Sequence, residues 1–177
     1  MKKGTIPQII NNFHLYKGSE NDGEMMLGIT GEITLPDFSA MVETITGSGF
    51  LGELEVNNPG HFSAINMEIP FIGINGDMLD IDTTNFNLIT MRACEQSKAK
   101  ATRELVFDQM KIVVGGVAKD FKLGAFKIGG QMGPSVTLSV DYMKIEIDGE
   151  TALELDKIGE IFVVNGEDKL AKIREMC

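Results

Sequence analysis

The chain has 177 residues and a formal net charge of −10, with 26 aspartate and glutamate residues against 16 lysine and arginine residues. Its length predicts one domain, 1–177, and its 43% hydrophobic content is ordinary for a globular protein with a buried core. The acidic balance excludes a protein that holds nucleic-acid backbones or anionic membranes, because such binding needs clustered lysine and arginine.

Alternation of apolar and polar residues, the signal of β-strands, runs through most of the chain. In chain order we predict strands over residues 24–35, 61–74, 84–95, 103–114, 118–128, 135–148, 151–156 and 160–164. The polar run 96–102 and the glycine-rich run 129–134 are expected as connections, and residues 78–82 as a short helical turn. The fold class is therefore mainly β, a sandwich or split barrel with one or two short helices.

The segment 38–58 is harder to assign. It begins with helical spacing, but glycines at 47, 49 and 52 interrupt it within two turns, so we expect a glycine-jointed loop over about 37–58. The loop carries five large apolar side chains, which are Phe38, Met41, Ile45, Phe50 and Leu51.

The strand predicted at 135–148 changes its apolar face. Residues 136, 138, 140 and 142 share one parity, whereas the apolar residues 143, 145 and 147 share the other, so the phase changes at Tyr142–Met143. Side chains alternate with a period of two, and a phase change therefore needs a bulge or a passage from one packed layer into another.

The end of the chain contains two turn signals and one helix signal. Asp148-Gly149 and Asn165-Gly166 are typical of tight turns. Residues 167–176 carry acids at their start and bases towards their end, which matches the helix dipole and predicts a C-terminal helix.

Two patterns resemble ligand sites but lack the required context. Gly47, Gly49 and Gly52 have the spacing of a dinucleotide-binding loop, yet no strand–loop–helix unit surrounds them. The acidic residues between Asn75 and Asp82 lack the glycine and glutamate positions of an EF-hand, which favours a solvated turn.

The chain offers no catalytic centre, metal site or cofactor site. His14 and His61 are the only histidines, and no histidine or cysteine pair has zinc-ligand spacing. A dyad of Cys94 with a histidine stays open, although Cys94 is best interpreted as a small residue on a strand. We therefore predict a protein that is not an enzyme and holds no cofactor.

The two cysteines, Cys94 and Cys177, do not form a disulfide framework and indicate reduced thiols. Met1-Lys2-Lys3 resembles the basic start of a signal peptide, but no apolar run follows it, and no stretch approaches the length of a membrane span. We expect synthesis in a cytoplasm and no membrane anchoring.

Several segments together resemble one known family. Residues 142–149 (YMKIEIDG), 153–156 (LELD) and 163–168 (VVNGED) are similar to the closing segment of the tail tube FII family of contractile-tailed bacteriophages. Near the start, residues 12–16 (NFHLY) and 33–36 (ITLP) are similar to that family's first elements. The resemblance covers nearly the whole chain, although residues 58–100 match only in pattern.

The resemblance implies a structural subunit. Six copies would form a ring, and rings would stack into a hollow tube inside a contractile sheath that conducts DNA into the host. The implied partners are other copies of the chain, the tail sheath protein, baseplate and tail-terminator proteins, and DNA that passes through without specific binding. The implied location is the virion tail, after synthesis in the cytoplasm of the host bacterium; a headless tail particle would use the same tube to perforate the envelope.

A tube subunit needs long strands that pair between neighbours, because closing a shared barrel removes exposed strand edges. The strands predicted at 103–114 and 135–148 are the candidates, and the phase change at Tyr142–Met143 fits a strand that leaves a shared barrel for the subunit's own sandwich. Exposed apolar groups on the loop 37–58 would mark a subunit interface. The alternative is a loop folded onto its own core.

Other functions stay open at this point. They are the tube protein of a bacterial contractile injection or secretion system, a monomeric β-barrel that binds a small ligand, and an enzyme, which ranks last. In a ring, six copies at −10 each carry −60. Acids that line the lumen would repel DNA, whereas acids that face outward would serve solubility.

Overall fold

The computed structural model describes residues 4–18 and 23–177, which leaves Met1–Lys3 outside the described residues. In chain order the elements are β1 (Thr5–Lys17), β2 (Glu24–Met25), β3 (Ala40–Thr46), β4 (Glu53–Phe62), β5 (Ile65–Pro70), α1 (Gly76–Leu79), β6 (Asn87–Ala99), β7 (Leu105–Lys122), β8 (Ser135–Ile147), β9 (Glu150–Asp156), β10 (Ile161–Val164), β11 (Glu167–Asp168) and α2 (Ala171–Met176). The predicted class is confirmed, because the described chain is mainly β with two short helices.

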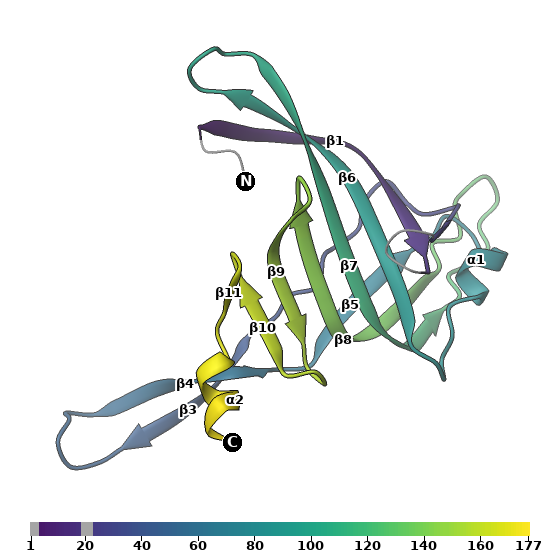
Figure 1. Cartoon of the computed structure of the whole chain (residues 1–177). Helices are drawn as coiled ribbons and strands as arrows, with labels where there is room; N and C mark the ends of the chain where they lie inside the picture. The colour runs from purple at the N-terminus through teal and green to yellow at the C-terminus, as the bar shows by residue number, and fades with distance from the viewer. Residues whose placement is uncertain (1–3, 19–22) are drawn as a thin grey trace.

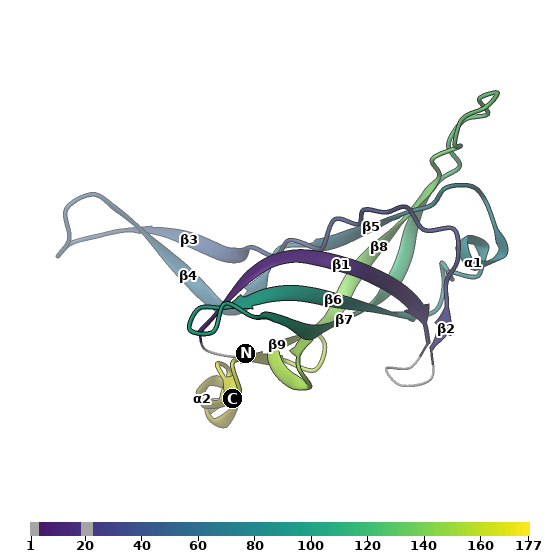
Figure 2. The same cartoon turned by 90° about the horizontal axis from the view of Figure 1, so that it is seen from above.

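One antiparallel sheet, called here the main sheet, organises the molecule (Figure 1). Its strand order is β11-β10-β9-β8-β7-β6-β1-β2, and β5 branches from it by pairing with β8. The neighbouring strands β1, β6 and β7 project together beyond the rest of the sheet at one end. Seen from above, the main sheet is curved, and β5 and α1 lie on one side of it (Figure 2).

The hydrophobic core lies between the main sheet and the elements on that side. In β5 the buried residues Ile65, Met67 and Ile69 alternate with exposed polar residues, as a half-buried strand requires. They pack with buried residues of the main sheet, among them Ile89 and Val114. Residues 26–39 close this core between the edges of β1 and β5, with a backbone hydrogen bond from Thr30 to Pro70.

β8 changes its neighbour halfway along its length. Residues 135–140 pair with β5 on one side, whereas residues 142–147 pair with β9 on the same side. Between them, Asp141 pairs with neither strand and accepts a backbone hydrogen bond from Lys157. β8 is thus shared by two layers, the β5 branch and the β9–β11 end of the sheet.

The buried face of β8 changes at the same place. Val140 and the alternate residues before it are buried, and after it the buried residue is Met143. The register with β7 shifts between Gly115, which faces Tyr142, and Gly116, which faces Val140. One extra residue in β8 at this bulge moves every later side chain to the opposite face.

Residues 37–58 do not form the expected loop. β3 and β4 pair into a separate two-stranded sheet, a hairpin that projects from the base of the molecule (Figure 1). The glycines do interrupt the chain, but they do so at the tip of the hairpin, where Gly49 and Gly52 have φ of 111° and 100°. The loop prediction was wrong because the strand β4 continues through Asn57 and Pro59 to Phe62, beyond the alternation of residues 53–56.

Other predicted boundaries also require correction. No strand was predicted over β1, although it pairs with β6 along its whole length. The expected connection 96–102 is mostly strand, because β6 continues to Ala99. The predicted strands 103–114 and 118–128 are one strand, β7, whose Gly115 and Gly116 form part of the bulge rather than an end.

The C-terminal helix is shorter than the predicted 167–176. The turn at Asn165 and Gly166 returns Glu167 and Asp168 to β10 as the short strand β11, and α2 begins only after Leu170. Asp168 accepts a hydrogen bond from the Leu170 backbone N–H and forms an ion pair with Arg174. The acids at the start of the predicted helix therefore belong to a strand and the turn after it.

Candidate assembly surfaces

The β3–β4 hairpin has one apolar and one polar face. Directly opposed residues of an antiparallel pair point to the same face. Ile45 faces Leu54, and the next opposed pair on that face is Val56 with Glu43, the one charged residue among these four. On the other face, Thr44 and Thr46 face Glu55 and Glu53. Because Ile45, Leu54 and Val56 are 40–50% exposed, the apolar face has no cover within the described chain.

Four of the five residues predicted for an interface are exposed on this hairpin. Met41 and Ile45 lie on β3, whereas Phe50 and Leu51 lie at its tip, where Leu51 is fully exposed.

Phe38 differs from the other four residues. It is half-buried at the base of the hairpin, where its ring lies 5.5 Å from that of Phe62, and the Phe62 ring lies 5.0 Å from that of Phe162. Phe38 therefore anchors the hairpin to the body. Leu54 and Val56 were missed, although their alternation with Glu53 and Glu55 is visible in the sequence.

The main sheet has an open edge along β1. β1 pairs with β6 on one side, but on the other side only Tyr16 and Lys17 pair, with β2. Among the described residues, no strand covers the outer edge of residues 5–15, although the Leu15 carbonyl already accepts a backbone hydrogen bond from Met26 there. An uncovered edge of this length presents backbone donors and acceptors that another chain can pair with.

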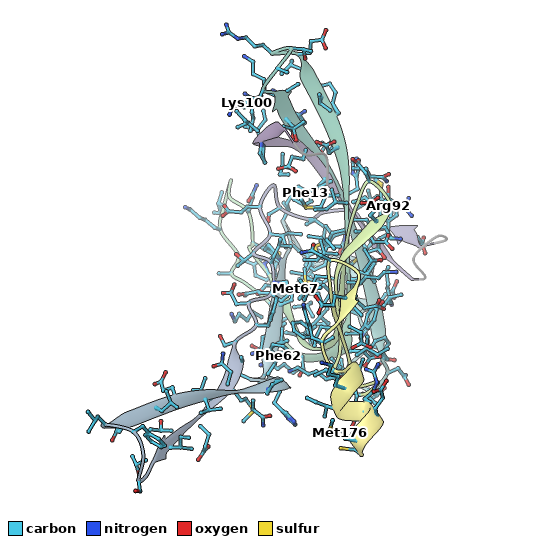
Figure 3. The ribbon with its side chains drawn as sticks, turned by 60° about the vertical axis from the view of Figure 1, so that its left-hand side comes forward. Phe13, Phe62, Met67, Arg92, Lys100 and Met176 are labelled. Carbon is cyan, nitrogen blue, oxygen red and sulfur yellow. The ribbon has the colours of Figure 1, made fainter. Side chains whose placement is uncertain are left out.

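The face of the main sheet that points away from the core is mainly polar in the middle of the sheet, although the exposed apolar residues Leu105 and Phe107 lie on it at the projecting end. Cross-strand register places His14, Arg92, Lys111 and Glu146 in one row across β1, β6, β7 and β8. The neighbouring row runs through Tyr16, Thr90, Val113, Lys144 and Glu154. Figure 3 shows Arg92 on one side of the sheet and Phe13 and Met67, which belong to the core side, on the other.

The charged side chains of this face contact one another. Glu146 accepts from Lys111 at 2.8 Å and from Lys144 at 2.9 Å. The Arg92 guanidinium lies 5.0 Å from the centre of the Tyr16 ring. Hydrogen bonds from Lys111 and then Lys144 hold the pKa of the Glu146 carboxyl below its ordinary value, which keeps the residue ionised.

The polar side chains of the acidic run 75–82 form specific hydrogen bonds. The Asn75 side chain caps α1 by accepting from the Met78 N–H, and Asp77 accepts from the Leu27 N–H at 2.6 Å. These bonds tie α1 to the segment after β2. In the described part of the chain, no three His, Cys, Asp or Glu side chains are grouped so that they could hold a metal ion.

Asp82 organises the connection from α1 to β6. Its carboxylate accepts from the N–H and hydroxyl of Thr84, both at 2.7 Å, and from the Asn85 amide. These bonds, led by that from Asn85, lower the pKa of Asp82 far below its ordinary value. The expected solvated turn is thus a specific, hydrogen-bonded turn.

The histidines and Cys94 do not form a hydrogen-bonded dyad in the described part of the chain. His61 lies on β4, whereas Cys94 faces Asn12 on the polar face of the main sheet. His14 is one pair further along that face, and no hydrogen bond joins it to Cys94 in the described chain. The described residues contain no helix that is both long and apolar enough to cross a bilayer.

The comparisons with known proteins agree with this architecture. The family model of phage tail tube protein FII matches residues 7–176. The tail tube protein of Escherichia phage P2 is 24% identical over 155 residues, which are 86% of this chain and 89% of the phage protein. The sheath/tube terminator of an extracellular contractile injection system has a similar fold, with a TM-score of 0.53 and 14% identity over 79% of this chain and 96% of the terminator. Since the family model covers almost the whole chain, the protein belongs to the phage tail tube protein FII family, whose members are structural subunits of tail tubes.

Proposed function

We propose that six copies of this chain form a ring, and that rings stack into the inner tube of a contractile tail, through which DNA enters the host. The observation that carries the proposal is the open edge of β1 in a tail tube family member. A curved sheet with a free edge on a long strand closes into a barrel when copies pair edge to edge, and closure removes the aggregation-prone edge.

The strand that joins neighbouring copies is β1 in this proposal. The strands at first favoured for this role, 103–114 and 135–148, correspond to β7 and β8, whose central parts have partners on both sides. Only the ends of β7 have a side without a neighbouring strand in the described chain, residues 105–109 towards β8 and residues 117–122 towards β6. β1 pairs on one side over most of its 13 residues and leaves the other side for a neighbour.

The β3–β4 hairpin supplies a second contact between copies. Its length and its exposed apolar face suit a segment that reaches another subunit of the same ring or of the next ring. Burial of Ile45, Leu54 and the tip residue Leu51 in that contact would remove apolar surface from water, which favours association.

The wider assembly follows from the same role. The sheath protein would surround the outside of the tube, and baseplate and tail-terminator proteins would contact its two ends. Consistent with family membership, we place the chain in the virion tail. A tube in a bacterial contractile injection or secretion system is the second candidate, and the fold similarity to a contractile injection system component favours it over a monomeric ligand carrier.

The hairpin contact is tested by truncating its tip. F50A/L51A should leave the fold intact, because both side chains are exposed, but should abolish the rings and tubes that we expect the unaltered protein to form at high concentration. Negative-stain electron microscopy would count the assemblies, and circular dichroism would report the fold. L79A, which truncates an exposed leucine on α1, is the matched control and should assemble normally. Intact assembly of F50A/L51A would contradict the hairpin's role, and a purely monomeric unaltered protein would contradict the proposed function.

A further inference from the structure

The polar face of the main sheet is electrically balanced, although the chain as a whole carries −10. By register four bases lie on it, Arg92, Lys98, Lys111 and Lys144. Four acids accompany them: Glu146, Glu154 and Asp168 share cross-strand rows with Lys111 or Lys144, and Asp156 lies in the next row, opposite Tyr142. The acidic excess must therefore be carried elsewhere on the molecule, for example on Glu53 and Glu55 of the hairpin.

The charged side chains of this face also form ion pairs with one another. Glu146 bridges two lysines, and all three side chains are only 15–18% exposed, which holds the ammonium groups against the carboxylate. The Tyr142 hydroxyl lies 3.1 Å from a carboxylate oxygen of Glu154. A lysine held in this way is less available to a phosphate than a solvated one, because its donors already have an acceptor.

A ring closed through the edges of the main sheet must turn one face inward. β5, α1 and the hydrophobic core lie on one side of the sheet, whereas α2 at the base of the molecule lies towards the other side (Figure 2). Most of the subunit is therefore on the β5 side, and we take the face with Arg92, Lys111 and Glu146 as the inner face.

We propose that this face lines the lumen and that Glu146, by neutralising Lys111 and Lys144, keeps the wall from holding DNA. The proposal rests on the proposed function, since it needs a closed tube. This mechanism differs from repulsion of DNA by an acidic lumen. Here DNA meets basic side chains whose charge is already compensated by a carboxylate. The proposal predicts that loss of the Glu146 carboxylate converts the lumen wall into a surface that binds polyanions.

The test uses assembled tubes of the E146Q variant and a fluorescent 20-base-pair DNA duplex. The loss of six carboxylates raises the net charge of each six-membered ring by six. At about 50 mM salt the E146Q tubes should retain roughly tenfold more duplex than unaltered tubes. The excess should be lost at about 500 mM salt, because phosphate contacts are salt-dependent. Co-sedimentation measures retention. E175Q makes the same charge change on exposed α2 and should retain no more DNA than the unaltered tube.

A rescue variant separates charge compensation from a general structural effect. K111Q/E146Q restores the original net charge and should bring DNA retention back to the level of the unaltered tube. If E146Q does not assemble, E154Q replaces it, since Glu154 accepts a hydrogen bond from the Tyr142 hydroxyl and bridges no lysine pair as Glu146 does in the described chain, and it should show a smaller increase. Equal retention by E146Q and unaltered tubes, or by E146Q and E175Q tubes, would overturn the proposal while leaving the tube function standing. Absence of tubes from the unaltered protein would contradict the proposed function itself.

Discussion

At the scale of single residues, the bulge in β8 depends on a glycine of the neighbouring strand. A Cβ atom at Gly116 would stand 2.0 Å from the Ser139 carbonyl oxygen and 3.1 Å from the Val140 Cα. Both atoms are backbone, so neither can move aside as a flexible side chain would. Gly116 is therefore required for the close approach of β7 and β8 at the point where β8 changes layer.

G116A should lower the free energy of unfolding by about 2–3 kcal/mol, in the range of overpacked sites. For a domain of this size the corresponding fall in Tm is roughly 5–10 °C. Differential scanning calorimetry measures it. G76A is the matched control, because a Cβ there meets no atom within 4 Å, and its Tm should stay equal to or slightly above that of the unaltered protein. An unchanged Tm for G116A would show that the bulge can relax.

The phase change at Tyr142–Met143 illustrates what residue patterns can reveal. The switch of apolar parity is visible in the sequence, because both halves of β8 have a buried face. A bulge or a change of layer was predicted as its cause, and the structure shows both; the glycines that oppose the bulge were not predicted, since Gly115-Gly116 in another strand looks like a strand end. Only the register between the two strands shows that these glycines oppose the bulge.

At the scale of elements, the turn 82–87 fixes how the chain enters β6. Asp82 accepts three side-chain and backbone hydrogen bonds, and the Asn87 amide donates to the Asp82 carbonyl at 2.7 Å. The lowered pKa of Asp82 means that the folded chain binds this proton less readily than the unfolded chain. Its stabilising effect is therefore complete above the ordinary pKa of 3.8 and declines as the pH falls below it.

D82N should lower Tm at pH 6, because the amide accepts fewer of these bonds. The difference from the unaltered protein should narrow at pH 3, where the carboxylate's contribution is already declining. Thermal melts at the two pH values provide the comparison. D80N removes a neighbouring exposed carboxylate and should have little effect at either pH. A D82N difference that stays constant or widens on acidification would contradict the role of the ionised carboxylate.

The hairpin shows where element prediction failed. Glycines near residues 47–52 were interpreted as joints of a loop, whereas they occupy the tip of a hairpin whose strands bury little apolar surface in the single chain. A pair of strands that packs on no core within its own chain has only a weak apolar–polar alternation in its sequence, because its apolar face is not buried in the single chain. β1 was missed for a related reason, because Ile6, Ile9 and Ile10 are exposed at the projecting end of the sheet.

At the scale of the whole molecule, the β class and the family resemblance were predictable, because strand alternation and the C-terminal segments are local patterns. The assembly surfaces were not, since they depend on which edges and faces remain uncovered after folding. The charge shows this most clearly: the net −10 suggested an acidic lumen, whereas the face assigned to the lumen is balanced by bases drawn from three separate strands.

The central claim is that the main sheet continues from copy to copy at the edge of β1. A cryo-electron microscopy reconstruction that resolves individual strands tests it most directly. We predict a six-fold ring in which residues 5–15 pair with a strand of the neighbouring copy, with Arg92, Lys111 and Glu146 facing the lumen and β5 outside. A ring in which the edge of β1 stays open to solvent, or in which β5 faces the lumen, would contradict the account.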